Sequence, residues 1–155
     1  MDIKMLMPIE FELVESAPLF HELLHLRDAV GMPSIGVEMA DGHPLQSLYW
    51  LSIHLTAQQD KNISTIVATA AVYGDNRQHL AIEDFIVLPE YRHIGLAKII
   101  LEQVMAFVDD RAVAGTYVSI NAHDEVETLC AAYGFTHTHC ANLGPNMGKV
   151  YAEGR

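Results

Sequence analysis

The sequence contains few cysteines, two among 155 residues, and this scarcity excludes a domain built on a disulfide scaffold. We expect both thiols, Cys130 and Cys140, to be reduced and the protein to be cytoplasmic. No apolar run approaches the roughly 20 residues that cross a bilayer, so a membrane partner is not expected. The N-terminal stretch MDIKMLMPIE is apolar only briefly and lacks a small-residue cleavage pattern, so we expect no signal peptide.

Basic residues are also scarce, because 9 Lys and Arg stand against 20 Asp and Glu, for a formal net charge of −11. This balance disfavours nucleic acid and anionic membrane surfaces as partners, since phosphate groups are bound by clustered Lys and Arg. It is compatible with a cationic or amine substrate, although the solubility of an acidic protein explains the charge equally well. The apolar content of 50% excludes disorder, and the length predicts a single domain over residues 1–155.

Alternating and helical spacings of apolar residues predict an α+β fold. The predicted strands lie at 9–14, 47–55, 63–73, 79–88 and 116–122, with one or two more in the tail at 135–141 and 147–153. The predicted helices lie at 17–30, 95–109 and 124–134, and the glycine- and proline-rich residues 31–46 are predicted to form a loop. A run of strands that feeds a helix and then a β-α-β unit indicates a mixed sheet with helices on both faces.

The stretch YRHIGLAKIILEQV (91–104) places Arg92, Gly95 and Ala97 at the beginning of a predicted helix, directly after a strand. The first amides of a helix lack intrahelical acceptors and carry partial positive charge, and a glycine there lets a ligand approach the backbone. Arg92 and Lys98 could add charge from the sides. This pattern predicts an anion site suited to a pyrophosphate. The alternative is a plain strand–turn–helix joint in which Gly95 only relieves crowding.

The same stretch resembles the GNAT superfamily, the acyl-CoA-dependent N-acetyltransferases. The acetyl-CoA motif of that family has the form Q/R-x-x-G-x-G/A, and Arg92–Ala97 reads R-H-I-G-L-A. IEDFIVLPEYR is similar to the fourth GNAT strand and its exit, and LCAAYGF to the later helix that ends in glycine-phenylalanine. The resemblance is strong over 79–135 and loose over 9–78. It implies the GNAT fold, a mostly antiparallel mixed sheet of six to seven strands in which a second helix can follow the first.

The resemblance also implies an activity, which is transfer of an acetyl group from acetyl-CoA to a primary amine of a small molecule or peptide. Family members often form homodimers. Amide hydrogens of the fourth strand would hold the pantetheine arm in a gap beside the fifth strand, and by position these belong to Phe85, Ile86 and Val87. The residues that the resemblance places around the pyrophosphate are Arg92, His93, Ile94, Gly95, Leu96, Ala97 and Lys98.

Amine acetylation needs a base, because an ammonium group is not a nucleophile. Glu83 and Asp84 lie on the strand 79–88, and strand alternation predicts that they point to opposite faces of the sheet. Glu83 would then share its side with Phe85 and Val87, so we favour Glu83 as the base. Either carboxylate could instead bind the substrate ammonium, or both could be solvated at a strand end.

A general acid for the leaving thiolate is less evident. Many family members carry a tyrosine at the position that Cys130 occupies here, and Tyr133, about a turn later, would point elsewhere. A neutral thiol at Cys130 could donate the proton, or Cys130 could simply pack in the core. Ser119, His123 or water could also serve. The missing tyrosine leaves open a second function, a GNAT-fold module that binds CoA without turnover.

Nine histidines raise the question of a metal site. His21 and His25 are four positions apart on a predicted helix, a spacing that can bind metal, but no nearby Asp, Glu or Cys completes a set. His137 and His139 share one face of a predicted strand. We expect exposed positions for the first pair and no bound metal at either.

Overall fold

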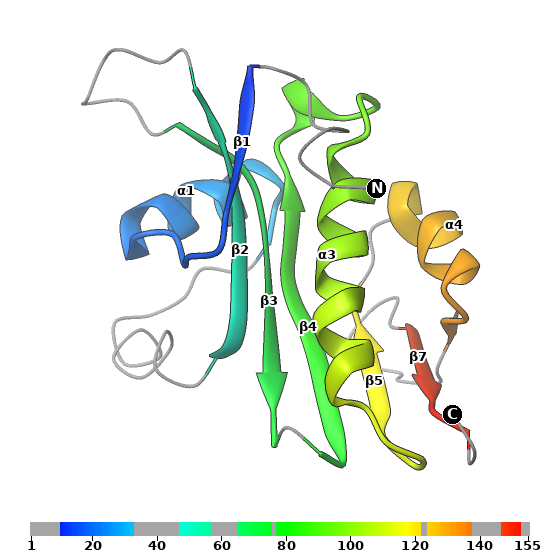
Figure 1. The fold of residues 1–155 in the computed structure, drawn as a ribbon. Helices are drawn as coiled ribbons and strands as arrows, with labels where there is room; N and C mark the ends of the chain where they lie inside the picture. Colours follow the sequence, from blue (N-terminus) through cyan, green and yellow to red (C-terminus); the bar gives the residue numbers. More distant parts are fainter. Residues whose placement is uncertain are drawn as a thin grey trace.

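The computed structural model describes residues 10–32, 47–56, 65–75, 77–121, 124–137 and 147–152, and these form a seven-stranded sheet (Figure 1). Its strands, in spatial order, are β1 (Phe11–Val14), β2 (Ser47–Leu55), β3 (Ile66–Gly74), β4 (His79–Val87), β5 (Tyr117–Ile120), β7 (Met147–Val150) and β6 (Thr136–His137). Only β4 and β5 run parallel, and the other neighbours are antiparallel. The predicted α+β fold with a mostly antiparallel mixed sheet is confirmed.

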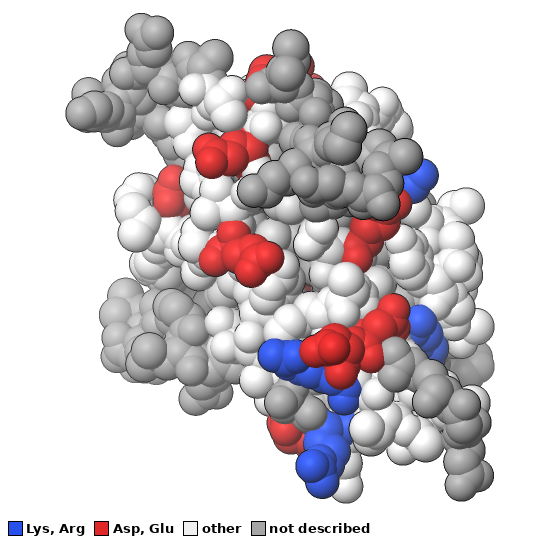
Figure 2. Space-filling view, in the orientation of Figure 1, with Lys and Arg blue, Asp and Glu red and all other residues white. Residues whose placement is uncertain are grey.

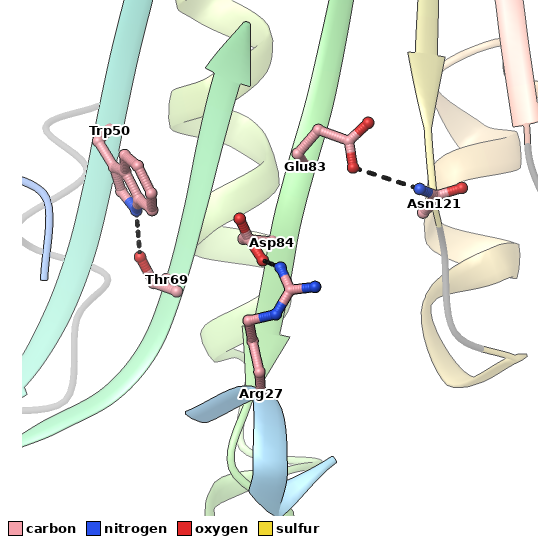
Figure 3. A network of polar contacts seen from close by, with 6 residues as sticks. All are labelled: Arg27, Trp50, Thr69, Glu83, Asp84 and Asn121. Carbon is pink, nitrogen blue, oxygen red and sulfur yellow. Dashed lines mark hydrogen bonds and ion pairs between the residues drawn. The ribbon is translucent and has the colours of Figure 1, made fainter. Parts of the chain in front are cut away.

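Within the described ranges, three α-helices cover the sheet. Helix α1 (Phe20–Ala29) lies on one face, and α3 (Leu96–Arg111) lies on the other with α4 (Asp124–Ala132) beside it (Figures 1 and 3). The stretch that could hold a second helix after the first, residues 33–46, lies outside the described residues. None of the helices within the described ranges is long and apolar enough to cross a membrane.

The core forms where the central strands meet α3. Strand β3 is buried from Ile66 to Val72, as expected for a strand covered on both faces. Helix α3 presents an apolar stripe at helical spacing toward the sheet, and its buried residues are Leu96, Ile99, Ile100, Leu101, Val104, Met105 and Val108. This packing fixes where α3 begins relative to the end of β4.

Strand β4 contains an irregularity that shapes the functional region. Ala71 of β3 pairs with Glu83, whereas Thr69 pairs with Ile86, so β4 carries one extra residue between these pairs. Such a bulge interrupts the alternation of side chains and bends the strand. Asp84 lies in the bulge with φ of 51°, a left-handed conformation that Asp adopts more readily than most residues.

Strands β4 and β5 pair over only part of their lengths. The last paired residue of β5 is Ile120, opposite Ile82, whereas β4 continues to Val87. The segment of β4 after Ile82 therefore has a backbone edge that β5 does not pair with, and we call this segment the open edge of β4.

Candidate functional site

Residues Arg92–Ala97, here called the entry turn, lead from the end of β4 into α3. His93 and Gly95 both have left-handed backbones, with φ of 66° and 94°. Gly95 is the N-cap of α3, and no side chain caps the helix there. The amide of Ile99 donates to the Gly95 carbonyl at 3.2 Å, so the amides of Leu96–Lys98 precede that bond. Amides in this position point outward along the helix axis and favour an anion.

The entry turn is open to a ligand. A Cβ built on Gly95 would meet no atom within 4 Å, so glycine is needed there for its positive φ and not for lack of room. His93, Ile94 and Gly95 are all exposed, and Ile94 has 47% of its surface accessible. An apolar side chain and outward amides thus lie together on an accessible turn.

Two basic residues flank the entry turn in different ways. The Arg92 Nε donates to the Val87 carbonyl at 3.2 Å, which ties the turn to the end of β4. Lys98 is exposed on the first turn of α3. Figure 2 shows that, among the described residues on this face, most Lys and Arg surface lies at the lower end, far from the beginning of α3. Arg92 and Lys98 are therefore the basic residues, among those described, that line the cavity at the entry turn together with its backbone amides.

A cavity of about 210 Å³ lies between the entry turn, the end of β4 and helix α4. Eight of the residues expected to bind the cofactor line it: Phe85, Val87, Arg92, His93, Gly95, Leu96, Ala97 and Lys98. Three further lining residues, Tyr91, Val126 and Leu129, were not foreseen. Val126 and Leu129 belong to α4, three positions apart on one helical face, and this spacing is the signal that could have identified them. The cavity is apolar along β4 and α4 and rich in amides at the turn.

Ile86 and Ile94 are the two expected cofactor residues that do not line the cavity. The Ile86 side chain is fully buried in the core. The Leu88 amide donates to Val67 of β3 at 2.9 Å, so by strand alternation the amide of Val87 points the other way, toward the open edge. Val87 is thus better placed than Ile86 to offer a backbone donor to a ligand along β4.

Two adjacent carboxylates lie on β4 where β5 ends. Asp84 contacts Arg27 of α1, and the Glu83 Oε2 accepts from Asn121 Nδ2 at 3.3 Å (Figure 3). Asp84 is buried, with 4% of its surface accessible, whereas Glu83 is half-buried. We call Arg27, Tyr73, Glu83 and Asp84 the carboxylate cluster.

The prediction that alternation separates Glu83 from Asp84 is wrong. Ala71 pairs with both Trp50 and Glu83, and it packs with Trp50 and Leu23 of α1, so Glu83 lies on the α1 side of the sheet. Asp84 reaches α1 as well, through Arg27 (Figure 3). The bulge explains the difference, because its extra residue resets the side-chain alternation along β4. The expectation that Glu83 shares its side of the sheet with Phe85 and Val87 is therefore also wrong, since those two residues line the cavity beside α3 and α4.

The environment of Glu83 favours its neutral form. Burial raises the pKa of Glu83 above its ordinary value, and the nearby charge of Asp84 raises it further. The hydrogen bond from Asn121 and the charge of Arg27 act in the opposite direction. Burial also raises the pKa of Tyr73, and the charges of Asp84 and Glu83 add to this effect. A carboxyl group with a raised pKa beside an open strand edge is suited to accept and release a proton.

Cys130 does not fit the role of a general acid. Its side chain is fully buried among core residues, and it is not among the residues that line the cavity. Burial raises the pKa of the Cys130 thiol to about 11, and Glu127 adds to the shift. Proton transfer from such a thiol to an ordinary thiolate would be uphill. The packing alternative therefore describes Cys130, and the acid role is withdrawn.

The other candidates for the general acid lie away from the cavity or outside the described residues. Tyr133 does not line the cavity, in keeping with the expectation that it points elsewhere, and its backbone carbonyl accepts from Lys149 Nζ at 2.5 Å. Ser119 Oγ contacts His79 Nε2 at 3.1 Å, on the part of the sheet where β5 still pairs with β4. His123 lies outside the described residues.

The described members of the two histidine pairs belong to no ligand set. His21 and His25 are exposed on α1, as expected. His137 contacts Glu127, and His139 lies outside the described residues. Within the described ranges, no three His, Cys, Asp or Glu residues are placed to hold a metal ion together.

Sequence reasoning missed Arg27 and Tyr73 as members of the carboxylate cluster. A signal for Arg27 is present, since it follows the buried Leu23 by four positions and therefore lies on the sheet-facing side of α1. A partly buried arginine is stabilised by an acidic partner, and adjacent acids in an otherwise apolar strand are the natural place to find one. Tyr73 carries no comparable signal in the sequence.

The sequence and the fold of the chain are similar to those of known proteins. The model of the acetyltransferase (GNAT) family matches residues 25–135. No curated protein sequence matches. Among solved structures, a "Probable Acetyltransferase" of unknown function from methicillin-resistant Staphylococcus aureus is similar with a TM-score of 0.72 at 23% identity, covering 83% of this chain and 92% of that one.

Two further similar structures come from streptococci. A GNAT family acetyltransferase from Streptococcus pneumoniae has a TM-score of 0.61 at 18% identity, covering 82% of this chain and 88% of that one. An acetyltransferase from Streptococcus agalactiae has a TM-score of 0.62 at 13% identity, covering 92% of this chain and 99% of that one. At these identities the likeness concerns the fold.

Proposed function

The chain belongs to the acetyltransferase (GNAT) family, and we propose that it transfers the acetyl group of acetyl-CoA to a primary amine of a small molecule or peptide. The observation that carries this proposal is the entry turn, whose outward amides and two left-handed residues adjoin an apolar cavity. A diphosphate fits the outward amides of the turn, and an uncharged pantetheine arm fits the apolar cavity.

The open edge of β4 gives the donor a path from the entry turn toward Glu83. The diphosphate would bind the amides of Leu96–Lys98, and the pantetheine arm would follow Phe85 and Val87. Acetyl-CoA supplies the thioester that reacts. Since Glu83 lies just beyond the end of the β4–β5 pairing, an arm that follows this edge would bring the thioester near its carboxylate.

Glu83 is proposed to accept a proton from the acceptor ammonium, directly or through water. The free amine nitrogen then bonds to the acetyl carbon, the carbon–sulfur bond breaks, and the thiolate takes a proton from solvent. Asp84 is excluded from this role because it is buried against Arg27. An acidic protein with a half-buried glutamate at the reaction site also favours a positively charged acceptor over a phosphorylated one.

A second function, CoA binding without turnover, is supported by the burial of Cys130. The position that could have held a general acid is a core thiol with a pKa raised to about 11. In that case the entry turn would still bind CoA, and Glu83 would have no catalytic role.

Thiol release from acetyl-CoA across a panel of amines separates the two functions. We expect release with at least one amine and its loss in Glu83→Gln, while CoA binding persists in both proteins. The matched control is Glu12→Gln, which changes a carboxylate on β1, away from the cavity. CoA binding without release on any amine would favour the second function.

A further inference from the structure

We propose that Arg27 of α1 is a positioning residue for Glu83, because it pairs with Asp84 in the β4 bulge and so leaves Glu83 as the carboxylate that exchanges the proton. The inference rests on the proposed function, in which Glu83 is the base. Arg27 touches no reacting atom in this arrangement and acts only through its neighbours.

The first argument is the geometry of the bulge. Arg27 Nη1 contacts Asp84 Oδ1 across 57 positions of sequence, and the two side chains are 15% and 2% exposed. Asp84 also has the left-handed backbone of the bulge, with φ of 51°. A buried carboxylate in a costly backbone conformation needs compensation, and a charge-assisted contact from α1 provides it. Arg27 thereby fixes the residue next to Glu83.

The second argument is the charge around Glu83. The groups that face it from the packed elements are Asp84 on β4, Tyr73 on β3, Arg27 on α1 and Asn121 after β5. Among these described groups, Arg27 alone carries positive charge. Two adjacent carboxylates without a cation cannot both ionise easily, and they then titrate as a pair. Arg27 opposes this repulsion, because its positive charge lies against the Asp84 carboxylate and lowers the pKa of Glu83.

The experiment is a carboxyl titration that needs no acceptor amine. The full-length protein is labelled with 13C at glutamate carboxyl groups, and the Glu83 resonance is identified by its loss in Glu83→Gln. Its titration by NMR is then compared in the wild type, Arg27→Met, Arg27→Lys and Asp84→Asn.

For each variant we expect a stated direction of shift in the pH at which Glu83 titrates. In Arg27→Met the Glu83 resonance should titrate at higher pH than in the wild type, since a cation that lowers the pKa of Glu83 has been removed. In Asp84→Asn it should titrate at lower pH, since a like charge has been removed. Arg27→Lys should stay close to the wild type, because it keeps the charge.

A double variant controls for misfolding, because it leaves no buried charge without its partner. Arg27→Met/Asp84→Asn removes both partners, and its Glu83 resonance should titrate in one step, closer to the wild type than in Arg27→Met. An unchanged Glu83 titration in Arg27→Met, in a protein with a native spectrum, would overturn the proposal. So would a shift no larger than those of the other glutamates.

The experiments distinguish a failure of the proposed function from a failure of the role assigned to Arg27. A Glu83 titration that responds to Arg27, in a protein that acetylates no amine, would refute the proposed function while leaving the Arg27–Glu83 coupling intact. Thiol release with an amine and an acid limb of the pH–rate profile that does not move in Arg27→Met would refute the role of Arg27 alone.

Discussion

The entry turn and the carboxylate cluster adjoin the same open edge of β4, but they are made from different parts of the chain. The entry turn is a continuous segment that works through backbone amides and positive φ angles. The carboxylate cluster joins α1 and β4 through side-chain charges and places the Tyr73 phenol of β3 beside them. A local segment is specified by its own sequence, whereas a cluster of distant side chains depends on the completed fold.

The entry turn and the carboxylate cluster should therefore tolerate different substitutions. Exposed side chains of the entry turn, such as Ile94, can change with little consequence if the backbone keeps its shape. The carboxylate cluster can keep its backbone and is still expected to lose its proposed role when one charge changes. Binding of the donor and transfer of the acetyl group should therefore be separable by mutation.

The largest effect is expected from Glu83→Gln. Loss of a general base lowers turnover by about 10²–10⁴-fold, and the neutral isostere leaves the entry turn untouched. We expect this loss in steady-state acetyl transfer with an unchanged dissociation constant for CoA. A parallel loss of CoA affinity would mean that the two regions are not independent.

A smaller effect is expected from Gly95→Ala. The left-handed backbone at φ of 94° costs a residue with a Cβ about 1–2 kcal/mol, although the space above it is open. That cost corresponds to about 5–30-fold weaker CoA binding, measured by calorimetry. Ile94→Ala, a change at an exposed neighbour in the same turn, is the control and should bind CoA nearly as the wild type does. Equal weakening in both variants would indicate that side chains, not backbone shape, make the site.

Cys130→Ala should change stability and not catalysis. The thiol is fully buried in the core, so its removal should lower the free energy of unfolding by about 1 kcal/mol. Urea denaturation measures this change, and acetyl transfer at equal folded concentration should match the wild type. A selective loss of turnover in a fully folded Cys130→Ala would restore the general-acid role.

The smallest effect concerns pH and stability. The folded-state pKa of Glu83 is raised, so the native protein holds a proton that the unfolded chain has lost, and stability falls as pH rises from the ordinary glutamate pKa through the raised one. Glu83→Gln lacks this penalty. The melting temperature of Glu83→Gln minus that of the wild type should therefore be larger at pH 7 than at pH 4, as followed by circular dichroism. The opposite sign would show that ionised Glu83 is stabilised in the fold.

The sequence predicted the fold and the entry turn well, for reasons that are local. Helical spacing in 95–109 predicted α3, which spans Leu96–Arg111, and the alternation in 47–55 predicted β2 with its observed bounds. The glycine before α3 could be identified because positive φ at a helix N-cap leaves few other choices.

The carboxylate cluster could not be predicted in the same way. We predicted from regular alternation that Glu83 and Asp84 lie on opposite faces, because the sequence pattern of a strand does not indicate a bulge. The partner of Asp84 lies 57 positions away, and only the packing of α1 against the sheet brings it there. Adjacent acids in an apolar strand were a sign of a site, but their directions depended on tertiary structure.

The most direct measurement is a crystal structure of the protein with CoA. We expect the diphosphate within hydrogen-bonding distance of the amides of Leu96–Lys98 and the pantetheine arm along Phe85 and Val87, with its thiol end directed toward Glu83. Ordered CoA at another surface, with the entry turn empty, would contradict this arrangement.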